Sequence, residues 1–168
     1  MSPVYCEVNM GIAALEEKFQ IFMQTHAANL PQLRALAKQI STIQKQMRRI
    51  LDEVTPSLCL ACSTKCCIGM PIEGWFTAED YFAYRMLYSV PQPTNGSPAN
   101  WRNCLFLQQE GCSLPEDMRP LACVKVNCEN LNIKLAEQGS LPAFKQLCEK
   151  LDDIQTQLWE TVNAQTEN

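Results

Sequence analysis

The chain has 168 residues, of which 46% are hydrophobic, and a formal net charge of −4 at pH 7. This length and apolar content suffice for one domain with a buried core, and they argue against extensive disorder. Nucleic-acid binding is not expected. A protein that binds a phosphate backbone normally needs basic residues clustered on one face, and the net charge of −4 argues against such a face.

The first part of the chain, residues 1–56, is predicted to be helical. Apolar residues recur at three- and four-residue spacing from Ile12 to Phe22, which predicts a helix that ends near Asn29. A second helix of about six turns is predicted to begin at Pro31, since proline suits a first helical turn, and to end before Pro56. Its apolar stripe comprises Leu33, Leu36, Ile40, Ile43, Met47, Ile50, Leu51 and Val54.

Residues 57–130 are expected to be largely irregular, with one short helix. Thr77 followed by Asp80 is a typical N-cap pair, and it predicts a helix over residues 78–87 that buries Tyr81, Phe82 and Met86. The acidic residues at its start, Glu79 and Asp80, are explained by helix-start electrostatics. The prolines and glycine of residues 90–100 predict an exposed loop, and the turn residue Gly111 predicts a small β-hairpin over residues 105–112.

The last part, residues 131–164, is again predicted to be helical. A short helix over residues 131–137 is closed by Gly139, and Ser140 with Pro142 marks the start of a longer helix. The apolar stripe of the longer helix comprises Phe144, Leu147, Leu151, Ile154, Leu158 and Val162. The two long amphipathic helices are expected to pack antiparallel within a single domain that spans residues 1–168. The alternative is that their heptad-like stripes form a surface for a homodimer or a protein partner.

Eight of the ten cysteines lie within residues 57–130, in two groups. The first group is Cys59, Cys62, Cys66 and Cys67, and the second is Cys104, Cys112, Cys123 and Cys128. Closely spaced thiolates bind zinc, copper(I) or iron–sulfur centres selectively. The adjacent side chains at 66 and 67 diverge, so they are not expected to ligate one ion together. The pattern therefore predicts metal binding, with the ligands of both groups interleaved or divided between two centres.

Arg119 is added to the predicted site, and the two remaining cysteines are left outside it. Four thiolates around a divalent ion leave a net charge of about −2, so the site requires a nearby cation. Arg119 is the best candidate for a fixed partner, because Pro120 restricts the backbone and a guanidinium donates to several acceptors at once. Cys148 lies beside the stripe of the last helix and is expected to act as a small hydrophobe, and Cys6 has no cysteine nearby, so both are left outside the site.

The motifs around these cysteines follow a fixed order: Cys59-x2-Cys62-x3-Cys66-Cys67, Phe76-Thr77-x2-Asp80, Cys104-Leu105-Phe106-Leu107, Gly111-Cys112-x-Leu114 and Arg119-Pro120-x2-Cys123-x4-Cys128. This order resembles the CxxCxxCC cysteine-cluster family of zinc- or iron-chelating domains. The resemblance covers residues 59–128, and it implies chelation by the eight cysteines. A related cluster in flagellin lysine methylases is associated with an iron–sulfur centre, so the resemblance gives weight to iron.

Three functions are compatible with this pattern. The first is a metal-binding protein that holds an iron–sulfur cluster or zinc in a redox or structural role. The second is an enzyme that uses the cluster to modify a protein side chain, although His26 is the chain's only histidine and lies far from the cysteines in the sequence. The third is a metal storage or delivery protein. No nucleophile triad, phosphate-binding loop or dinucleotide fingerprint is present in the sequence.

The location of the protein also follows from the pattern of residues. Residues 1–17 lack the basic region and apolar run of a secretory signal, and no stretch of the sequence is apolar enough to span a membrane. We therefore expect a cytoplasmic protein without a membrane anchor. In a reducing cytosol, a dense set of cysteines more often binds metal than forms disulfides.

Overall fold

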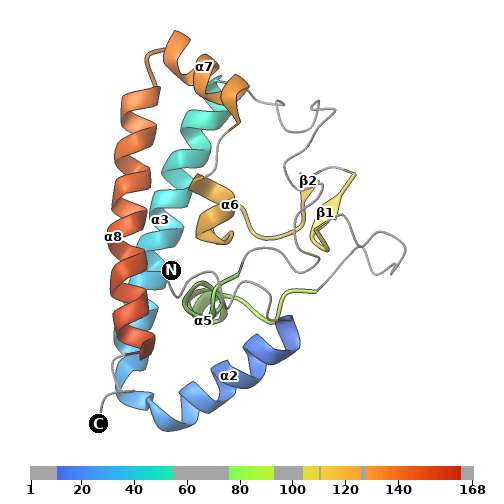
Figure 1. The fold of residues 1–168 in the computed structure, drawn as a ribbon, viewed down its shortest axis with the longest axis vertical. Coiled ribbons are helices and arrows are strands. Elements are labelled where there is room, and N and C mark those ends of the chain that lie inside the picture. The colour runs from blue at the N-terminus through green and yellow to red at the C-terminus, as the bar shows by residue number, and fades with distance from the viewer. Residues whose placement is uncertain (1–10, 55–75, 93–103, 110, 126–127, 164–168) are drawn as a thin grey trace.

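The computed structural model describes residues 11–54, 76–92, 104–109, 111–125 and 128–163 (Figure 1). Within these ranges the chain is mainly helical with one two-stranded antiparallel hairpin, which confirms the expected fold class. None of the helices described is long and apolar enough to cross a lipid bilayer. The elements are α2 (Ile12–Thr25), a 3-10 turn η1 (Ala27–Asn29), α3 (Leu30–Val54), α5 (Ala78–Leu87), β1 (Leu107–Gln108), β2 (Gly111–Cys112), α6 (Leu121–Lys125), α7 (Glu129–Glu137) and α8 (Leu141–Asn163).

Helices α3 and α8 lie side by side and antiparallel, as the sequence predicts (Figure 1). A hydrogen bond marks each end of the pair: Asn29 Nδ2 donates to the Thr161 carbonyl at 3.2 Å, and Gln138 Nε2 donates to the Val54 carbonyl at 3.5 Å. Most of the predicted stripe residues are buried between these helices and their neighbours, while Ile43, Ile50, Leu51 and Val162 are half-buried against the same core. The stripes therefore belong to the core of the chain.

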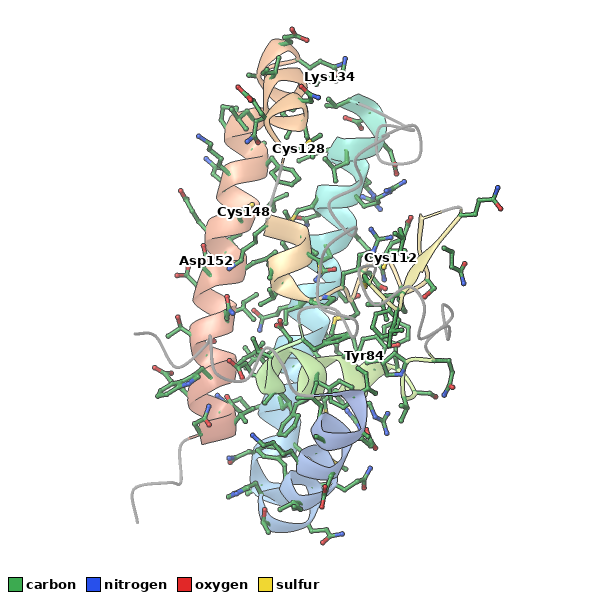
Figure 2. The ribbon with its side chains drawn as sticks, turned by 45° about the vertical axis from the view of Figure 1, so that its right-hand side comes forward. Tyr84, Cys112, Cys128, Lys134, Cys148 and Asp152 are labelled. Carbon is green, nitrogen blue, oxygen red and sulfur yellow. The ribbon has the colours of Figure 1, made fainter. Side chains whose placement is uncertain are left out.

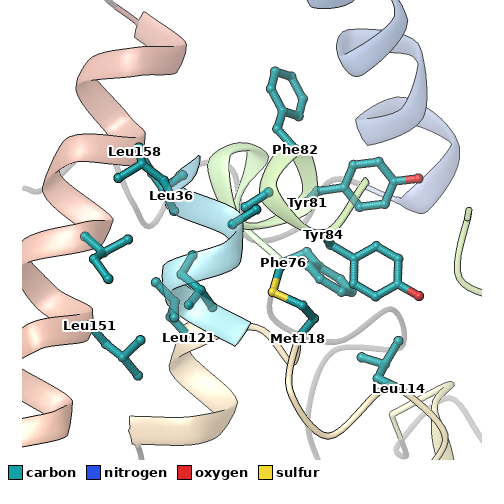
Figure 3. Close-up of a cluster of buried hydrophobic side chains, with 14 of the residues drawn as sticks. Leu36, Phe76, Tyr81, Phe82, Tyr84, Leu114, Met118, Leu121, Leu151 and Leu158 are labelled. Atoms are coloured by element: carbon teal, nitrogen blue, oxygen red, sulfur yellow. The ribbon is translucent and has the colours of Figure 1, made fainter. Parts of the chain in front are cut away.

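Helix α5 lies at the centre of the core and contacts α2, α3 and α8. The sequence predicts one apolar face, but every residue from Ala78 to Tyr84 is buried, whereas Met86 is half-buried. Phe76 contacts Tyr81 and Tyr84 edge to face, with ring centroids 5.7 and 5.6 Å apart (Figure 3). It also contacts Phe106 edge to face, at 6.2 Å. Because α5 is covered on several sides, its N-terminal acidic residues are buried together with its aromatic residues.

One predicted helix end was wrong, and one short helix was not predicted. Helix α2 ends at Thr25 instead of near Asn29, because His26 adopts φ −125° and ψ 37°, which interrupts the helical hydrogen bonds before η1 begins. The short helix α6 was not predicted, because five residues contain too few apolar positions to show helical periodicity. The small hairpin is confirmed, with Leu107 paired to Cys112 and Gln108 to Gly111.

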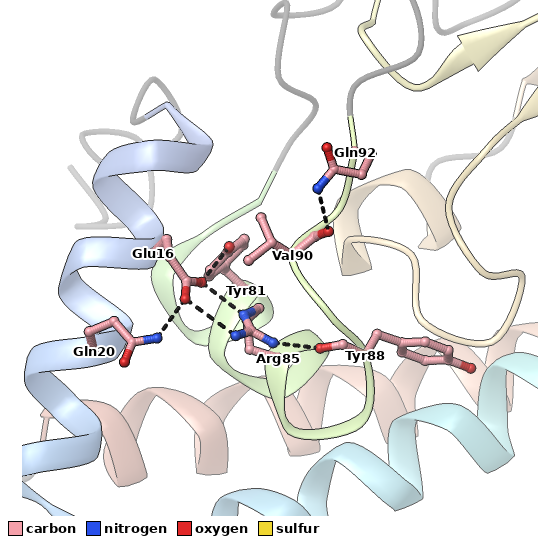
Figure 4. A network of polar contacts seen from close by, with 7 residues as sticks. All are labelled: Glu16, Gln20, Tyr81, Arg85, Tyr88, Val90 and Gln92. Carbon is pink, nitrogen blue, oxygen red and sulfur yellow. Dashed lines mark hydrogen bonds and ion pairs between the residues drawn. The ribbon is translucent and has the colours of Figure 1, made fainter.

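A polar cluster fastens α2 to α5 (Figure 4). Glu16 Oε2 accepts hydrogen bonds from Arg85 Nε and from the Tyr81 hydroxyl, both at 2.8 Å. Arg85 also lies over the Phe19 ring, 5.1 Å from its centroid. Burial raises the pKa of the Glu16 carboxyl, but hydrogen bonds from Arg85, Gln20 and Tyr81 outweigh burial and hold the pKa below its usual range. The ionised carboxylate is therefore the form that stabilises the fold.

Replacing Glu16 with glutamine is expected to lower the free energy of unfolding at neutral pH by about 1–3 kcal/mol, the usual contribution of hydrogen bonds to a charged group. Because the folded-state pKa is lowered, this stabilisation is present above the unfolded pKa and is lost as the pH falls through the folded value. Urea unfolding at pH 7 and pH 3 measures the change. Glu17→Gln, at an exposed position of the same helix, is the control. A Glu16→Gln effect that is equal at both pH values would contradict the assignment.

The turn between α7 and α8 requires a left-handed residue. Gly139 has φ +72°, its N–H donates to the Ala136 carbonyl at 3.0 Å, and the Ser140 N–H donates to the Leu135 carbonyl at 2.8 Å. This pair of hydrogen bonds is a Schellman motif, which satisfies carbonyls at a helix end. Gly139 thus closes α7, as the sequence predicts, and sets the direction in which α8 begins.

Gly139→Ala is expected to lower the free energy of unfolding by about 1–2 kcal/mol, because a Cβ is strained in the left-handed region. Apart from Gly139 and its chain neighbours, no heavy atom of the described residues lies within 4 Å of the position of the added Cβ, so we expect no contribution from a steric clash. Gly139→Asn is the control and should cost less, because asparagine tolerates this conformation. Thermal unfolding measures both variants, and equal melting temperatures for alanine and glycine would contradict the role given to this turn.

Candidate metal centre

Four of the eight predicted ligands lie in the described part of the chain, and four lie outside it. Cys59, Cys62, Cys66 and Cys67 lie outside the described residues, as does Cys6. The second group is described: Cys104 is buried, Cys112 is half-buried, and Cys123 and Cys128 are exposed. Within the part of the chain that the structure describes, no three Cys, His, Asp or Glu side chains form a group that could hold a metal ion.

Cys104 and Cys112 are brought together by the hairpin. Cys104 begins the turn that leads into β1, and its carbonyl accepts the Leu107 N–H at 3.0 Å. Cys112 pairs with Leu107 across the two strands, and the Ser113 N–H donates to the Phe106 carbonyl at 2.8 Å. The two thiols are close enough for the charge of Cys112 to act on Cys104. A hairpin thus joins two cysteines that are separated by eight positions in the sequence.

The surroundings of Cys104 combine burial with hydrogen bonding. Burial raises the pKa of its thiol, and the charge of Cys112 raises it further. The backbone N–H of Phe106, and to a smaller extent that of Leu107, lower the pKa, because N–H dipoles near the sulfur stabilise a thiolate. Backbone donors of this kind surround metal-bound sulfur in proteins. The pair is therefore suited to a cation, which would remove the penalty of two neighbouring thiolates.

Cys123 and Cys128 lie apart from this pair. Cys123 is within α6, where its N–H donates to the Pro120 carbonyl at 2.9 Å, and Cys128 is the N-cap residue of α7. Figures 1 and 2 show β2, which carries Cys112, on a different side of α6 from the start of α7 at Cys128. The four described cysteines therefore supply a pair at the hairpin and two exposed residues near α6 and α7.

Cys148 lies on α8, half-buried against the core, in agreement with the hydrophobic role predicted for it. Burial raises the pKa of its thiol, as do Asp152 and Glu149, while Lys125 lowers it. Lys125 itself donates from Nζ to Asp152 and to Gln155, the latter at 2.9 Å. This lysine therefore joins α6 to α8.

Arg119 lies in the segment that precedes α6. The side chain of Gln44 holds its backbone, accepting from the Arg119 N–H and donating to the Arg119 carbonyl, both at 2.9 Å. The Arg119 Nε is buried and has no hydrogen-bond partner among the described residues. A buried donor without an acceptor is costly, so this guanidinium is suited to an acceptor such as a thiolate or a metal-bound sulfur.

Asp117 fixes the same segment to α3 and to the residue after α5. Its Oδ1 accepts from the Tyr88 hydroxyl at 2.6 Å, and its Oδ2 accepts from the Ser41 hydroxyl at 2.7 Å and lies 3.1 Å from Lys45 Nζ. Burial raises the pKa of Asp117, but these hydrogen bonds outweigh burial and lower the pKa. Burial and the bond to Asp117 raise the pKa of Tyr88 to about 12.

The position of Asp80 at the start of α5 explains only part of its role. Its N–H bonds to the Thr77 hydroxyl at 3.2 Å, which confirms the predicted N-cap. Its carboxylate accepts the Thr77 N–H at the start of α5, as in a capping box, and its Oδ2 also accepts the Leu121 N–H of α6 at 3.2 Å; the residue is 5% exposed. Burial and the neighbouring Glu79 raise the pKa of Asp80 to about 7. Helix-start electrostatics alone therefore do not explain this carboxylate.

Comparison with known proteins adds no relative: no family model, no curated protein and no solved structure matches the chain.

Burial and raised pKa predict slow reaction of Cys104, because the thiolate is the nucleophile. In native protein kept in EDTA, Cys104 should react with iodoacetamide several-fold more slowly than the exposed Cys128. Peptide mass spectrometry after timed labelling measures both rates. In urea the two rates should converge, which serves as the control. Equal rates in the native protein would contradict the environment assigned to Cys104.

Proposed function

We propose that the protein binds a metal centre, either an iron–sulfur cluster or zinc, in a redox or structural role. The observation that carries this proposal is the hairpin: Cys104 begins the turn that leads into β1, and Cys112 lies in β2, paired with Leu107. Two thiols on one small hairpin can both bind a soft cation. The proposed ligands are Cys59, Cys62, Cys66, Cys67, Cys104, Cys112, Cys123 and Cys128.

The sequence spacing supports the remaining ligands of this proposal. Zinc and iron–sulfur sites commonly use four ligands, so a pair of thiols requires at least two more. The first group of cysteines supplies closely spaced sulfurs, and the order of motifs resembles the CxxCxxCC family. Membership of that family is part of the proposal. The resemblance to the cluster of flagellin lysine methylases favours iron. Four sulfur ligands also suit zinc, which prefers a tetrahedral arrangement.

Arg119 supports the charge balance that the proposal requires. Four thiolates around a divalent ion leave a net charge of about −2, and a guanidinium compensates it without competing for the metal. The buried Nε of Arg119 lacks an acceptor among the described residues, and the backbone of this residue is fixed by Gln44. We therefore assign Arg119 the role of a cation that donates to ligand sulfur.

Cytoplasmic location is a further part of the proposal, because thiolate ligands remain reduced there. A homodimer through the helix stripes receives less support. Most stripe residues of α3 and α8 are buried in the core that these helices form with α5, so a dimer through the whole stripes would require the core to open. Contact with a protein partner would use another surface.

The first test is the metal content of protein purified without oxygen. Iron with a matching amount of acid-labile sulfide would identify a cluster, and one or two zinc ions per chain without sulfide would identify zinc. Neither iron nor zinc above the level of a cysteine-free protein prepared in parallel would overturn the proposal.

Cys62→Ser and Cys112→Ser are expected to lower metal content and melting temperature together, because metal binding contributes directly to folding stability. Cys148→Ser is the matched control: the position is half-buried on α8, so its metal content should stay unchanged. Elemental analysis and thermal unfolding measure all three variants. Full metal content with an unchanged melting point in both Cys62→Ser and Cys112→Ser would show that the ligand assignment is wrong.

A further inference from the structure

Two adjacent acidic side chains are buried at the start of α5. Glu79 is 4% exposed and Asp80 is 5% exposed, although acidic residues are almost never fully buried unless they are paired. The N-terminal end of a helix favours negative charge, but burial acts against it, because a buried carboxylate loses its hydration. Two neighbouring carboxylates also repel each other. The position therefore favours a carboxyl that keeps its proton to a higher pH than usual.

Asp80 joins this buried end of α5 to α6. Its carboxyl accepts the Thr77 N–H, and its Oδ2 accepts the Leu121 N–H at 3.2 Å. Leu121 is the first residue of α6 and is 1% exposed. A helix of five residues is not stable on its own, because nucleation costs more than one turn of hydrogen bonds returns. The stability of α6 therefore depends on contacts of this kind with the longer helices.

The charged groups that act on Asp80 have opposite effects. Glu79 raises the pKa of the Asp80 carboxyl, and Lys125, at the end of α6, lowers it. The helices that contact α5 carry charged groups that are already paired: Glu16 of α2 with Arg85, Lys45 of α3 with Asp117, and Asp152 of α8 with Lys125. Burial is the largest effect, and together with Glu79 it raises the pKa of Asp80 to about 7.

The raised pKa links the proton on Asp80 to the position of α6. When α6 opens, water reaches the carboxyl, and its pKa returns toward the usual value of about 4. Because the pKa is higher in the closed form, the stabilisation of that form is complete below the open-form pKa and is lost as the pH rises through the closed-form pKa. The open form therefore gains population as the pH rises toward about 7, and its population levels off above that pH.

We propose that the contact between α5 and α6 at Asp80 is a pH-sensitive switch, in which α6 lies on α5 while Asp80 is protonated and opens as Asp80 ionises. A protonated carboxyl keeps an oxygen that accepts the Leu121 N–H, so the closed form needs no buried charge. Opening is local, because Gln44 holds the backbone of Arg119 through a neutral amide, which does not titrate. The inference does not depend on the proposed metal centre, since neither Asp80 nor Leu121 is a proposed ligand.

The test is hydrogen–deuterium exchange of the full-length protein as purified, measured by mass spectrometry in peptides that span α6. Each rate is divided by the intrinsic rate of an unprotected peptide at the same pH, because exchange is itself base-catalysed. Between pH 5.5 and pH 7.5 we expect the protection of α6 to fall about tenfold or more, and to change little at higher pH. Asp80→Asn cannot ionise and keeps an oxygen for the Leu121 N–H, so its protection should stay constant over this range.

Two further variants change the charges that act on Asp80. Lys125→Met removes the cation and should raise the pH at which the fall in protection levels off, whereas Glu79→Gln removes the neighbouring carboxylate and should lower it. Should Asp80→Asn fail to fold, these opposite shifts test the switch independently. Glu116→Gln, at an exposed position of the segment before α6, is the matched control and should keep the pH dependence of wild type.

Wild-type protection that stays constant from pH 5.5 to pH 7.5 would overturn the inference, as would a fall in Asp80→Asn equal to that in wild type. The ¹³C chemical shift of the Asp80 carboxyl gives a second measurement. A midpoint near pH 7 supports the switch, and a midpoint at the usual value of about 4 overturns it. Wild-type protein without iron or zinc would overturn the proposed function and not this inference, because the exchange measurement requires no metal.

Discussion

The structure depends on buried polar side chains that bind the backbone of an irregular segment. Residues 104–109 and 111–125 contain a hairpin with two residues per strand and one short helix, so they have no long run of helical or sheet hydrogen bonds. Gln44, Asp80 and Asp117 supply or receive the hydrogen bonds that join this segment to α3 and α5. Unpaired buried peptide groups are costly, and these contacts remove that cost at defined positions. The long helices thus serve as a frame on which the cysteine-bearing segment is fixed.

The frame gives the cysteines different environments. The hairpin places Cys104 and Cys112 together, partly withdrawn from water, with N–H donors directed at one sulfur. Cys123 and Cys128 are exposed near the ends of short helices. A group that can compensate negative charge is also present. The guanidinium of Arg119 is partly buried, and Gln44 holds the backbone of the same residue. This combination of soft donors, fixed backbone and a cation is consistent with the proposed metal centre.

The helical parts of the fold could be predicted because their signal is local. The stripes of α3 and α8 repeat over several turns, and proline and glycine mark the ends, so the pattern of the sequence alone indicates helices and their antiparallel packing. The end of α2 and the existence of α6 could not be predicted. Both are decided over a few residues, where tertiary contacts outweigh weak intrinsic preference. The contact of the Asp80 side chain with Leu121 could not be predicted either, because the two residues lie far apart in the sequence.

The sequence by itself determined the helical class, the long stripes, the N-cap at Thr77 and the set of sulfur residues, because periodicity, capping and composition are properties of neighbouring residues. Only the tertiary structure decided that α5 is buried on several sides and that Gln44 and Asp80 hold the backbone before Cys123. Those features join residues far apart in the chain. They arise from the packing of α3, α5 and α8, which no local pattern of the sequence encodes.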